Sequence, residues 1–231
     1  MYKAVFLDFY GTLVHEDDAI VPLICEAIQQ STELPCTAEQ IGRYWWEKFS
    51  STCRISFGAD FQTQRTIGIS SLQQTIDQFQ AECNAEMLIR SQFEHWSRPK
   101  GYDDTMPFLQ ALKGVSVFIL SNIDTSDLIQ AMDYHDITAD GIITSEDVRS
   151  YKPRPEMFHE ALKRSGFHPH EVIHIGDSIT NDVYGAHQVG IQTIWLNRLN
   201  RQLPETMQAD IICTNLYEAA DILINGNRRL T

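Results

Sequence analysis

The pattern of apolar and polar positions divides the chain into two kinds of segment. Short apolar runs of strand type alternate with amphipathic helices in the second half of the chain, and one such run also opens the sequence. Between residues 16 and 96 the apolar positions recur at helical spacing instead, and no strand pattern occurs. The predicted strands are residues 4–7, 115–120, 141–144, 172–175, 192–196 and 210–213. Strands that alternate with helices predict parallel βαβ units.

Helices are expected where apolar residues recur every three or four positions. In the first half they are predicted at residues 21–30, 41–49, 60–67, 70–80 and 85–96. Thr37 and Gln40 have the spacing of a capping box and introduce the second of these helices. In the second half helices are predicted at residues 104–112, 127–134, 156–165, 182–188 and 216–224. The polar and basic tail, residues 225–231, is expected to fray.

The first strand must pair with the later ones, because on its own it could not bury both of its faces. The helical segment 16–96 is therefore predicted to be an insertion into an α/β core with a parallel sheet. This core takes residues 1–15 and 97–231. A chain of 231 residues is long enough for one large domain or two unequal ones.

Composition narrows the classes of function. A chain with 43% hydrophobic and 21% charged residues has ordinary globular composition. Its net charge of −13 argues against nucleic acid or an anionic membrane as the main partner, because these bind clustered Lys and Arg. No apolar stretch approaches the roughly 18 residues of a membrane span, and no secretory signal is evident. We therefore expect a cytoplasmic protein, with its five cysteines reduced.

Polar residues of catalytic type follow the predicted strands. Asp8 and Asp177 each come just after a strand, and Ser121 and Asn122 follow another. Lys152 lies in a loop that two prolines hold out of a helix. Because the carboxyl ends of parallel strands meet at one edge of a sheet, we expect these side chains to lie close together. Each alone has a structural explanation, such as a turn or a helix cap, but their order and spacing together favour a site.

In that order the residues resemble the haloacid dehalogenase (HAD) superfamily of hydrolases, over nearly the whole chain. The segments that carry the resemblance are Asp8-Phe-Tyr-Gly-Thr12, Ser121-Asn122, Tyr151-Lys152-Pro153, and Gly176-Asp177-Ser178 followed by Asn181-Asp182. The resemblance implies a Rossmann-like core whose Asp8 attacks the substrate and forms a covalent aspartyl intermediate. It also implies that segment 16–96 is an all-helical cap domain, with hinges near residues 14–17 and 97–101.

The resemblance further implies a metal site. Asp8 and Asp177, with the backbone carbonyl of Tyr10, offer hard oxygen ligands suited to Mg²⁺. Asp182 is expected to orient Lys152 or a metal-bound water, and so counts among the candidate catalytic residues.

The remaining groups suit a phosphate monoester. Lys152 would supply positive charge to the transferring phosphoryl group, and the hydroxyl of Ser121 would donate to its oxygens. The expected backbone N–H donors are those of Phe9, Tyr10 and Asn122. The substrate implied is a small phosphorylated molecule.

Position 10 departs from most phosphatases of the superfamily, which carry a second Asp there as general acid and base. Tyr10, a candidate catalytic residue by position, is a usable hydrogen-bond donor but a poor base, since an unperturbed phenol has a pKa of about 10. Loss of a general acid or base costs roughly 10²- to 10⁴-fold in rate. Asp-x-Tyr-Gly-Thr is similar instead to the 2-haloacid dehalogenase branch, in which Asp attacks carbon and the leaving halide needs no proton.

Asp177 opposes the dehalogenase interpretation, because that branch has a Ser-Ser-Asn run in this region and needs no metal. Carboxylates at positions 8, 177 and 182 demand a cation or raised pKa values. The preferred hypothesis is a Mg²⁺-dependent phosphatase, with a 2-haloacid dehalogenase and a non-catalytic HAD-like binding or regulatory protein as alternatives. A dehalogenase would need cap residues to hold its substrate, for which the candidates are Arg43, Trp45, Trp46 and Arg54. The simpler interpretation of these four is a helix core with surface arginines, and His174 and His187 are likewise interpreted as packed or surface residues.

Overall fold

The computed structural model describes residues 2–225, and a parallel sheet of six strands forms its centre. The strands are β1 (Ala4–Leu7), β2 (Ser116–Ser121), β3 (Gly141–Thr144), β4 (Val172–Gly176), β5 (Gln192–Leu196) and β6 (Ile211–Cys213). Their order is β3-β2-β1-β4-β5-β6, and every neighbouring pair is parallel. The predicted α/β class with a parallel sheet is therefore confirmed. The tail expected to fray lies, from residue 226 on, outside the described residues.

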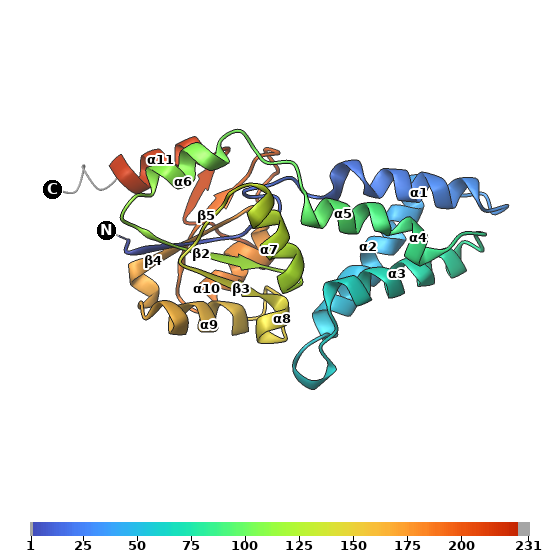
Figure 1. The fold of residues 1–231 in the computed structure, drawn as a ribbon, viewed down its shortest axis with the longest axis horizontal. Coiled ribbons are helices and arrows are strands. Elements are labelled where there is room, and N and C mark those ends of the chain that lie inside the picture. The colour runs from blue at the N-terminus through green and yellow to red at the C-terminus, as the bar shows by residue number, and fades with distance from the viewer. Residues whose placement is uncertain (1, 226–231) are drawn as a thin grey trace.

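Helices cover both faces of this sheet (Figure 1). They are α6 (Thr105–Ala111), α7 (Thr125–Tyr134), α8 (Ser145–Val148), α9 (Glu156–Ser165), α10 (Gly185–His187) and α11 (Leu216–Asn225). Alternate residues of β1 serve the two faces: Val5 and Leu7 pack with α6, α7 and α11, whereas Ala4 and Phe6 pack with α9 and α10. Because both faces are buried, every residue of β1 is apolar, and apolar residues predominate in the other strands.

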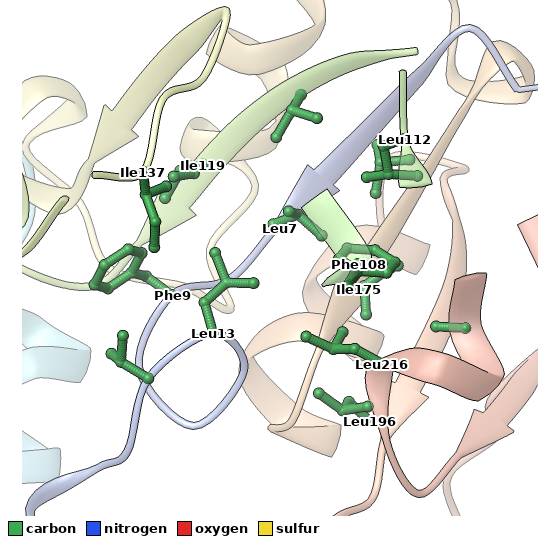
Figure 2. Packing of buried hydrophobic residues seen from close by; sticks show 14 of the residues in the cluster. Leu7, Phe9, Leu13, Phe108, Leu112, Ile119, Ile137, Ile175, Leu196 and Leu216 are labelled. Atoms are coloured by element: carbon green, nitrogen blue, oxygen red, sulfur yellow. The ribbon is translucent and has the colours of Figure 1, made fainter. Parts of the chain in front are cut away.

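Each face of the sheet carries a cluster of buried apolar residues, and Figure 2 shows the larger of these two clusters. Leu7 of β1 and Ile175 of β4 meet Phe108 of α6 and Leu216 of α11 between the sheet and its helices. Phe9 and Leu13, which follow β1, belong to the same cluster, and both are fully buried. The loop after β1 is thus fixed by its own apolar side chains, which gives Asp8 a rigid support.

Between residues 16 and 96 the described residues form helices and no strand, as predicted. These are η1 (Asp17–Ala19), α1 (Val21–Gln30), α2 (Ala38–Ile55), η2 (Gly58–Asp60), α3 (Gln64–Gln78), α4 (Ala85–Leu88) and α5 (Arg90–Ser97). They have a buried cluster of their own, which includes Ile28, Ile41 and Leu72. In Figure 1 this helical insertion stands to one side of the sheet. None of the described helices has the length and apolarity needed to cross a membrane.

Two chain segments join the insertion to the sheet, and they run side by side. The N–H of His15 donates to the carbonyl of Lys100 at 2.8 Å, and Val14 forms an antiparallel bridge with Gly101. These contacts lie at the two segments predicted as hinges. A double connection of this kind restrains how the insertion can move relative to the sheet.

Several helix boundaries predicted in the insertion are wrong. The predicted helices 60–67 and 70–80 are one helix, α3, which begins only after its N-cap Thr63. It continues through Gly68 because the packing there is close: a Cβ at that position would lie 2.9 Å from Cδ1 of Ile89. Conversely, the predicted helix 85–96 is divided at Ile89 into α4 and α5. Helical periodicity in the sequence records neither the close packing at Gly68 nor the division at Ile89.

The capping box predicted for α2 is present: Thr37 accepts the N–H of Gln40, whose side chain accepts the N–H of Thr37. The sequence offers Asp103 or Asp104 as the cap of the following core helix, α6; Asp104 occupies the N-cap position, but its carboxylate makes no cap hydrogen bond. It accepts two N–H groups from the guanidinium of Arg198 and the backbone N–H of Leu216 instead. Asp104 therefore ties α6 to α11 and to the loop after β5.

Candidate functional site

The candidate site lies at the carboxyl ends of β1 and β4, the two central strands of the sheet. After β1 the chain adds strands on one side, and after β4 it adds them on the other. Ligands of open α/β sheets bind at such a switch point, because the connections leave in opposite directions and open a crevice. Asp8 directly follows β1, and Asp177 directly follows β4. The sheet order therefore places these two carboxylates side by side.

Asp8, Asp177 and Asp182 form a buried cluster in which each offers a carboxylate oxygen within 4.8 Å of the others. Burial is the main cause that raises the pKa of Asp8 to about 7; Lys152 opposes the shift, whereas Asp182 and Asp177 add to it. Burial, followed by the charges of Glu16 and Asp182, raises the pKa of Asp177 to about 7 as well. The cluster thus carries more negative charge than its own cations balance.

Lys152 is the cation at the centre of this cluster. Its Nζ donates to Oδ1 of Asp8 at 2.7 Å, to Oδ1 of Asp182 at 2.6 Å and to the carbonyl of Leu120 at 2.9 Å. These contacts use all the N–H groups of an ammonium. Burial lowers the pKa of Lys152, but the two carboxylates outweigh burial and hold it above its ordinary value. Lys152 is therefore a fixed positive charge beside Asp8.

Asp182 lies on a π-helix, η4 (Ile179–Tyr184), where a regular α-helix was predicted to begin, and its own N–H bonds to the carbonyl of Ser178 at 2.9 Å. The N–H of Val183 bonds back five residues to the carbonyl of Ser178. Oδ2 of Asp182 accepts the N–H of Ser178 at 3.0 Å, which folds the side chain toward the strand. Gly176 is needed for this approach, since a Cβ there would lie 2.2 Å from Cγ of Asp182.

His174, in β4, is fully buried, in agreement with its interpretation as a packed residue. Its ring packs edge-on against Phe158, and its Nε2 lies 3.0 Å from Oδ1 of Asp182. Burial lowers the pKa of His174, so the ring is neutral at physiological pH and donates from Nε2. Burial alone would raise the pKa of Asp182, but Lys152 and His174 hold it below its ordinary value. His174 therefore orients Asp182, and Asp182 in turn orients Lys152.

Groups without partners surround Asp8. Within residues 2–225, the buried hydroxyl of Ser121 has no hydrogen-bond partner, and neither do the backbone N–H groups of Phe9, Tyr10 and Asn122. Buried polar groups are normally paired, so these donors are available to a ligand. The side chain of Asn122 is already engaged, because it accepts the N–H of Lys152 at 2.7 Å and donates to its carbonyl at 3.1 Å. Asn122 thus fixes the loop that carries Lys152.

The hydroxyl of Tyr10 is turned to the insertion. It donates to the backbone carbonyl of Trp96, in α5, at 2.5 Å. Burial, together with the charges of Asp127 and Asp17, raises the pKa of this phenol well above its usual value. Tyr10 is therefore neutral and cannot serve as a base. Its backbone carbonyl accepts no hydrogen bond from the described residues and is free to bind a cation.

Sequence reasoning assigned no contact with Asp177 to three residues that shape this side of the cluster. Nη2 of Arg201 donates to the carbonyl of Asp177 at 2.7 Å and to its Oδ2 at 3.1 Å. Nε1 of Trp195 donates to the same carbonyl at 2.8 Å. Gly11 has a positive φ of 84°, and a Cβ there would lie 2.6 Å from Oδ1 of Asp177. Gly11 carried a turn signal in the sequence, but nothing marked Trp195 or Arg201, whose positions depend on the sheet order.

The comparison with protein families assigns the protein to the hydrolases. The model of the haloacid dehalogenase-like hydrolase family matches residues 2–190, so the chain belongs to this family, as the sequence motifs predicted. L-2-haloacid dehalogenase from Xanthobacter autotrophicus has the same fold, with a TM-score of 0.77 and 20% identity over 96% of this chain and 98% of that chain.

Individual relatives include both phosphatases and dehalogenases. Glyceraldehyde 3-phosphate phosphatase of Pyrococcus furiosus is 35% identical over 81 residues, which are 33% of each chain. The chain thus spans only about a third of this relative. (S)-2-haloacid dehalogenase 1 of Pseudomonas sp. (strain CBS-3) is 26% identical over 208 residues, which are 86% of each chain. The similarities alone do not choose between the two reactions.

Proposed function

We propose that the protein is a Mg²⁺-dependent phosphatase of a small phosphorylated metabolite, which acts through an aspartyl phosphate on Asp8. The observation that carries the proposal is the buried cluster of Asp8, Asp177 and Asp182, whose oxygens lie within 4.8 Å of one another. A dehalogenase that works without metal has no use for the carboxylate of Asp177 in this place.

The donor set fits a hard divalent cation. Asp8 and Asp177, with the free carbonyl of Tyr10, are oxygen ligands of the kind that Mg²⁺ prefers. Burial, and after it the neighbouring carboxylates, raise the pKa values of Asp8 and Asp177, and a bound cation would oppose both effects. When bound, the ion would supply the positive charge that lets an anionic nucleophile approach an anionic phosphate.

The protein's own residues supply the rest of the chemistry. The Asp8 carboxylate attacks phosphorus, so that an oxygen–phosphorus bond forms on Asp8 while the bond to the leaving alkoxide breaks. Lys152 holds Asp8 in place and offsets its charge, and the hydroxyl of Ser121 donates to the phosphoryl oxygens. The free backbone donors at this edge are those of Phe9, Tyr10 and Asn122. The alkoxide takes a proton from water and leaves as the alcohol. A second water then hydrolyses the aspartyl phosphate, which releases inorganic phosphate and restores the Asp8 carboxylate.

In this proposal residues 16–96 form a cap domain over a core of residues 1–15 and 97–231. Support comes from the separate buried cluster of the insertion and from the paired connections at Val14 and Gly101. A cap would exclude water while phosphate is transferred. Free cysteines, among them the buried Cys25 and Cys213, fit a reducing cytoplasmic location.

A 2-haloacid dehalogenase is the second candidate, and Tyr10 is the observation that favours it. Its hydroxyl is held by the carbonyl of Trp96, so the phenol of Tyr10 does not protonate a leaving alkoxide. A halide leaves without a proton, and the lack of an acid then costs nothing. The extended similarity to the Pseudomonas dehalogenase agrees with this alternative.

One set of assays separates these functions. Phosphate release from a panel of phosphorylated metabolites is measured with and without Mg²⁺, beside halide release from 2-chloropropionate, with Asp8→Asn as the control. We expect Mg²⁺-dependent phosphate release that the variant lacks. Halide release that needs no Mg²⁺ and is lost in Asp8→Asn would replace the proposal by the dehalogenase. Absence of both activities would favour a non-catalytic binding role.

A further inference from the structure

A second concave site lies beside α5, and none of the residues of the carboxylate cluster lines it. It is a groove of about 790 Å³. Arg65 of α3 and several residues of α5 form one part of its wall, and Gln130 of α7 forms another. The groove therefore lies between the helical insertion and the core. Its volume falls in the range of small-molecule sites, which is roughly 300–1,000 Å³.

The charge of this groove is opposite to that of the whole chain. Arg65, Arg90 and Arg98 line it, and among its described lining residues Glu94 alone is acidic, although the chain carries a net charge of −13. Arg90 and Arg98 are exposed, and within residues 2–225 neither side chain forms a salt bridge or hydrogen bond. Two guanidinium groups are thus free to take an anionic ligand.

Arg65 is held in place before any ligand arrives. Its guanidinium makes a two-point contact with Asp127, from Nε at 2.8 Å and from Nη2 at 2.6 Å. It also lies over the ring of Phe93, 4.4 Å from the ring centre. In the described structure its Nη1 has no acceptor, so the group keeps donor capacity toward the groove. A preorganised guanidinium loses little entropy when it binds.

The spacing of the arginines indicates the shape of the ligand. Arg90 begins α5 and Arg98 follows its end, so their Cα atoms are separated by about 12 Å at the helical rise of 1.5 Å per residue. Arg65 lies over Phe93, between them. A single phosphate could reach only one part of this row, whereas a chain of phosphates can follow it.

We propose that the groove binds a linear oligophosphate, either free or as the triphosphate of a nucleotide. Guanidinium groups suit such a ligand, because they bind phosphate oxygens with paired, charge-assisted hydrogen bonds. The ligand contacts the insertion through α3 and α5 and the core through α7. It therefore binds the two parts of the molecule together. This site is independent of the proposed phosphatase activity.

The test measures binding by calorimetry, with metal-stripped protein and with inorganic tripolyphosphate, ATP and adenosine as probes. The double variant Arg90→Gln with Arg98→Gln is compared with Arg43→Gln with Arg54→Gln, which removes the same charge from exposed positions on α2 outside the groove. In the double variant Arg90→Gln with Arg98→Gln, the groove variant, we expect Kd for tripolyphosphate and for ATP to rise about tenfold or more. The control variant should stay near the wild-type Kd, and adenosine should not bind.

Equal affinity for the two phosphate probes assigns recognition to the phosphate chain, and tighter binding of ATP assigns the ligand to nucleotides. Lack of binding to the wild type overturns the proposal. So does binding that survives in the groove variant, as it would if the probe occupied the region of Ser121 and Lys152. Circular dichroism establishes that both double variants are folded. If a double variant is not folded, the test is repeated with the single changes at Arg90 and Arg98. Each of these is expected to weaken binding severalfold.

Discussion

Asp177→Asn should make the metal-free protein more stable, although it removes a group that we assign to the metal site. The change keeps the shape of the side chain and removes one charge from the cluster. Burial, with the charges of Glu16 and Asp182, raises the pKa of Asp177 from its ordinary 3.8 to about 7. A difference of about three pKa units corresponds to a cost on the order of 4 kcal/mol for the ionised carboxylate.

This cost already includes the opposing effect of Arg201, which lowers the pKa of Asp177 against burial. Arg201 bonds to the Asp177 carboxylate, but its side chain is 45% exposed, so solvent screens the pair and its contribution is small. An amide at position 177 can also still accept an N–H from Arg201. We therefore expect the variant to gain on the order of 1–3 kcal/mol in free energy of unfolding above pH 7 or so.

The sign of the pH dependence follows from the direction of the shift. A carboxyl group whose pKa is higher in the folded state binds more protons folded than unfolded, between its ordinary pKa and the raised one. Wild-type stability should therefore fall as pH rises from 3.8 to about 7, and the fall should be smaller in Asp177→Asn. The advantage of the variant is full above this window and disappears below it.

The free energies of unfolding of metal-stripped wild type and Asp177→Asn are measured in urea below and above this pH window. The same measurements are then repeated with added Mg²⁺. Mg²⁺ should stabilise the wild type and leave Asp177→Asn nearly unchanged. Asp133→Asn, at an exposed position of α7, controls for the loss of one surface charge. Equal stability of wild type and Asp177→Asn at high pH, or equal stabilisation of both by Mg²⁺, would refute the reasoning.

Three further changes test the surroundings of the cluster. Gly11→Ala should cost about 1–3 kcal/mol in urea unfolding and weaken Mg²⁺ binding in calorimetry, because of its positive φ and the contact of its new Cβ with a carboxylate; wild-type values for both would contradict this. His174→Ala should cost about 2–4 kcal/mol, since it opens a cavity and removes a donor from Asp182; a loss below about 1 kcal/mol would show that the contact is unimportant. Tyr10→Asp should raise Mg²⁺-dependent phosphate release about tenfold or more by supplying a general acid, whereas Tyr10→Phe should not; an unchanged rate in folded Tyr10→Asp would mean that another group already acts as the acid.

The sequence was most informative where the environment is uniform. A strand that is buried on both faces is mainly apolar at successive positions, and the strands Ala4–Leu7, Gly141–Thr144 and Gln192–Leu196 agree with their predictions at both ends. The gathering of Asp8 and Asp177 followed from the same logic. Parallel strands have their carboxyl ends at one edge of the sheet, so a charged residue that directly follows an apolar strand lies at that edge.

Contacts between distant segments left no comparable trace. Arg201 contacts Asp177 from the loop after β5, and Trp195 contacts it from β5 itself. Neither contact is marked by a periodic pattern of residues in the sequence. The side chain of Asn122 belongs to a recognisable motif, yet its bonds to the backbone of Lys152 depend on how two loops meet. Tyr10 shows the same limit, because its hydroxyl turns to an insertion whose placement the local sequence does not encode.

The π-helix that carries Asp182 makes the length of its loop as restrictive as its composition. Each residue of an α-helix turns by about 100°, so deletion of one residue after Ser178 would restore regular winding and turn Asp182 about 100° away from Lys152. Every motif residue would still be present in such a chain, but the carboxylate would no longer meet the ammonium. Family members that share this chemistry should therefore tolerate substitution at the exposed Thr180 far better than any change in the number of residues around it.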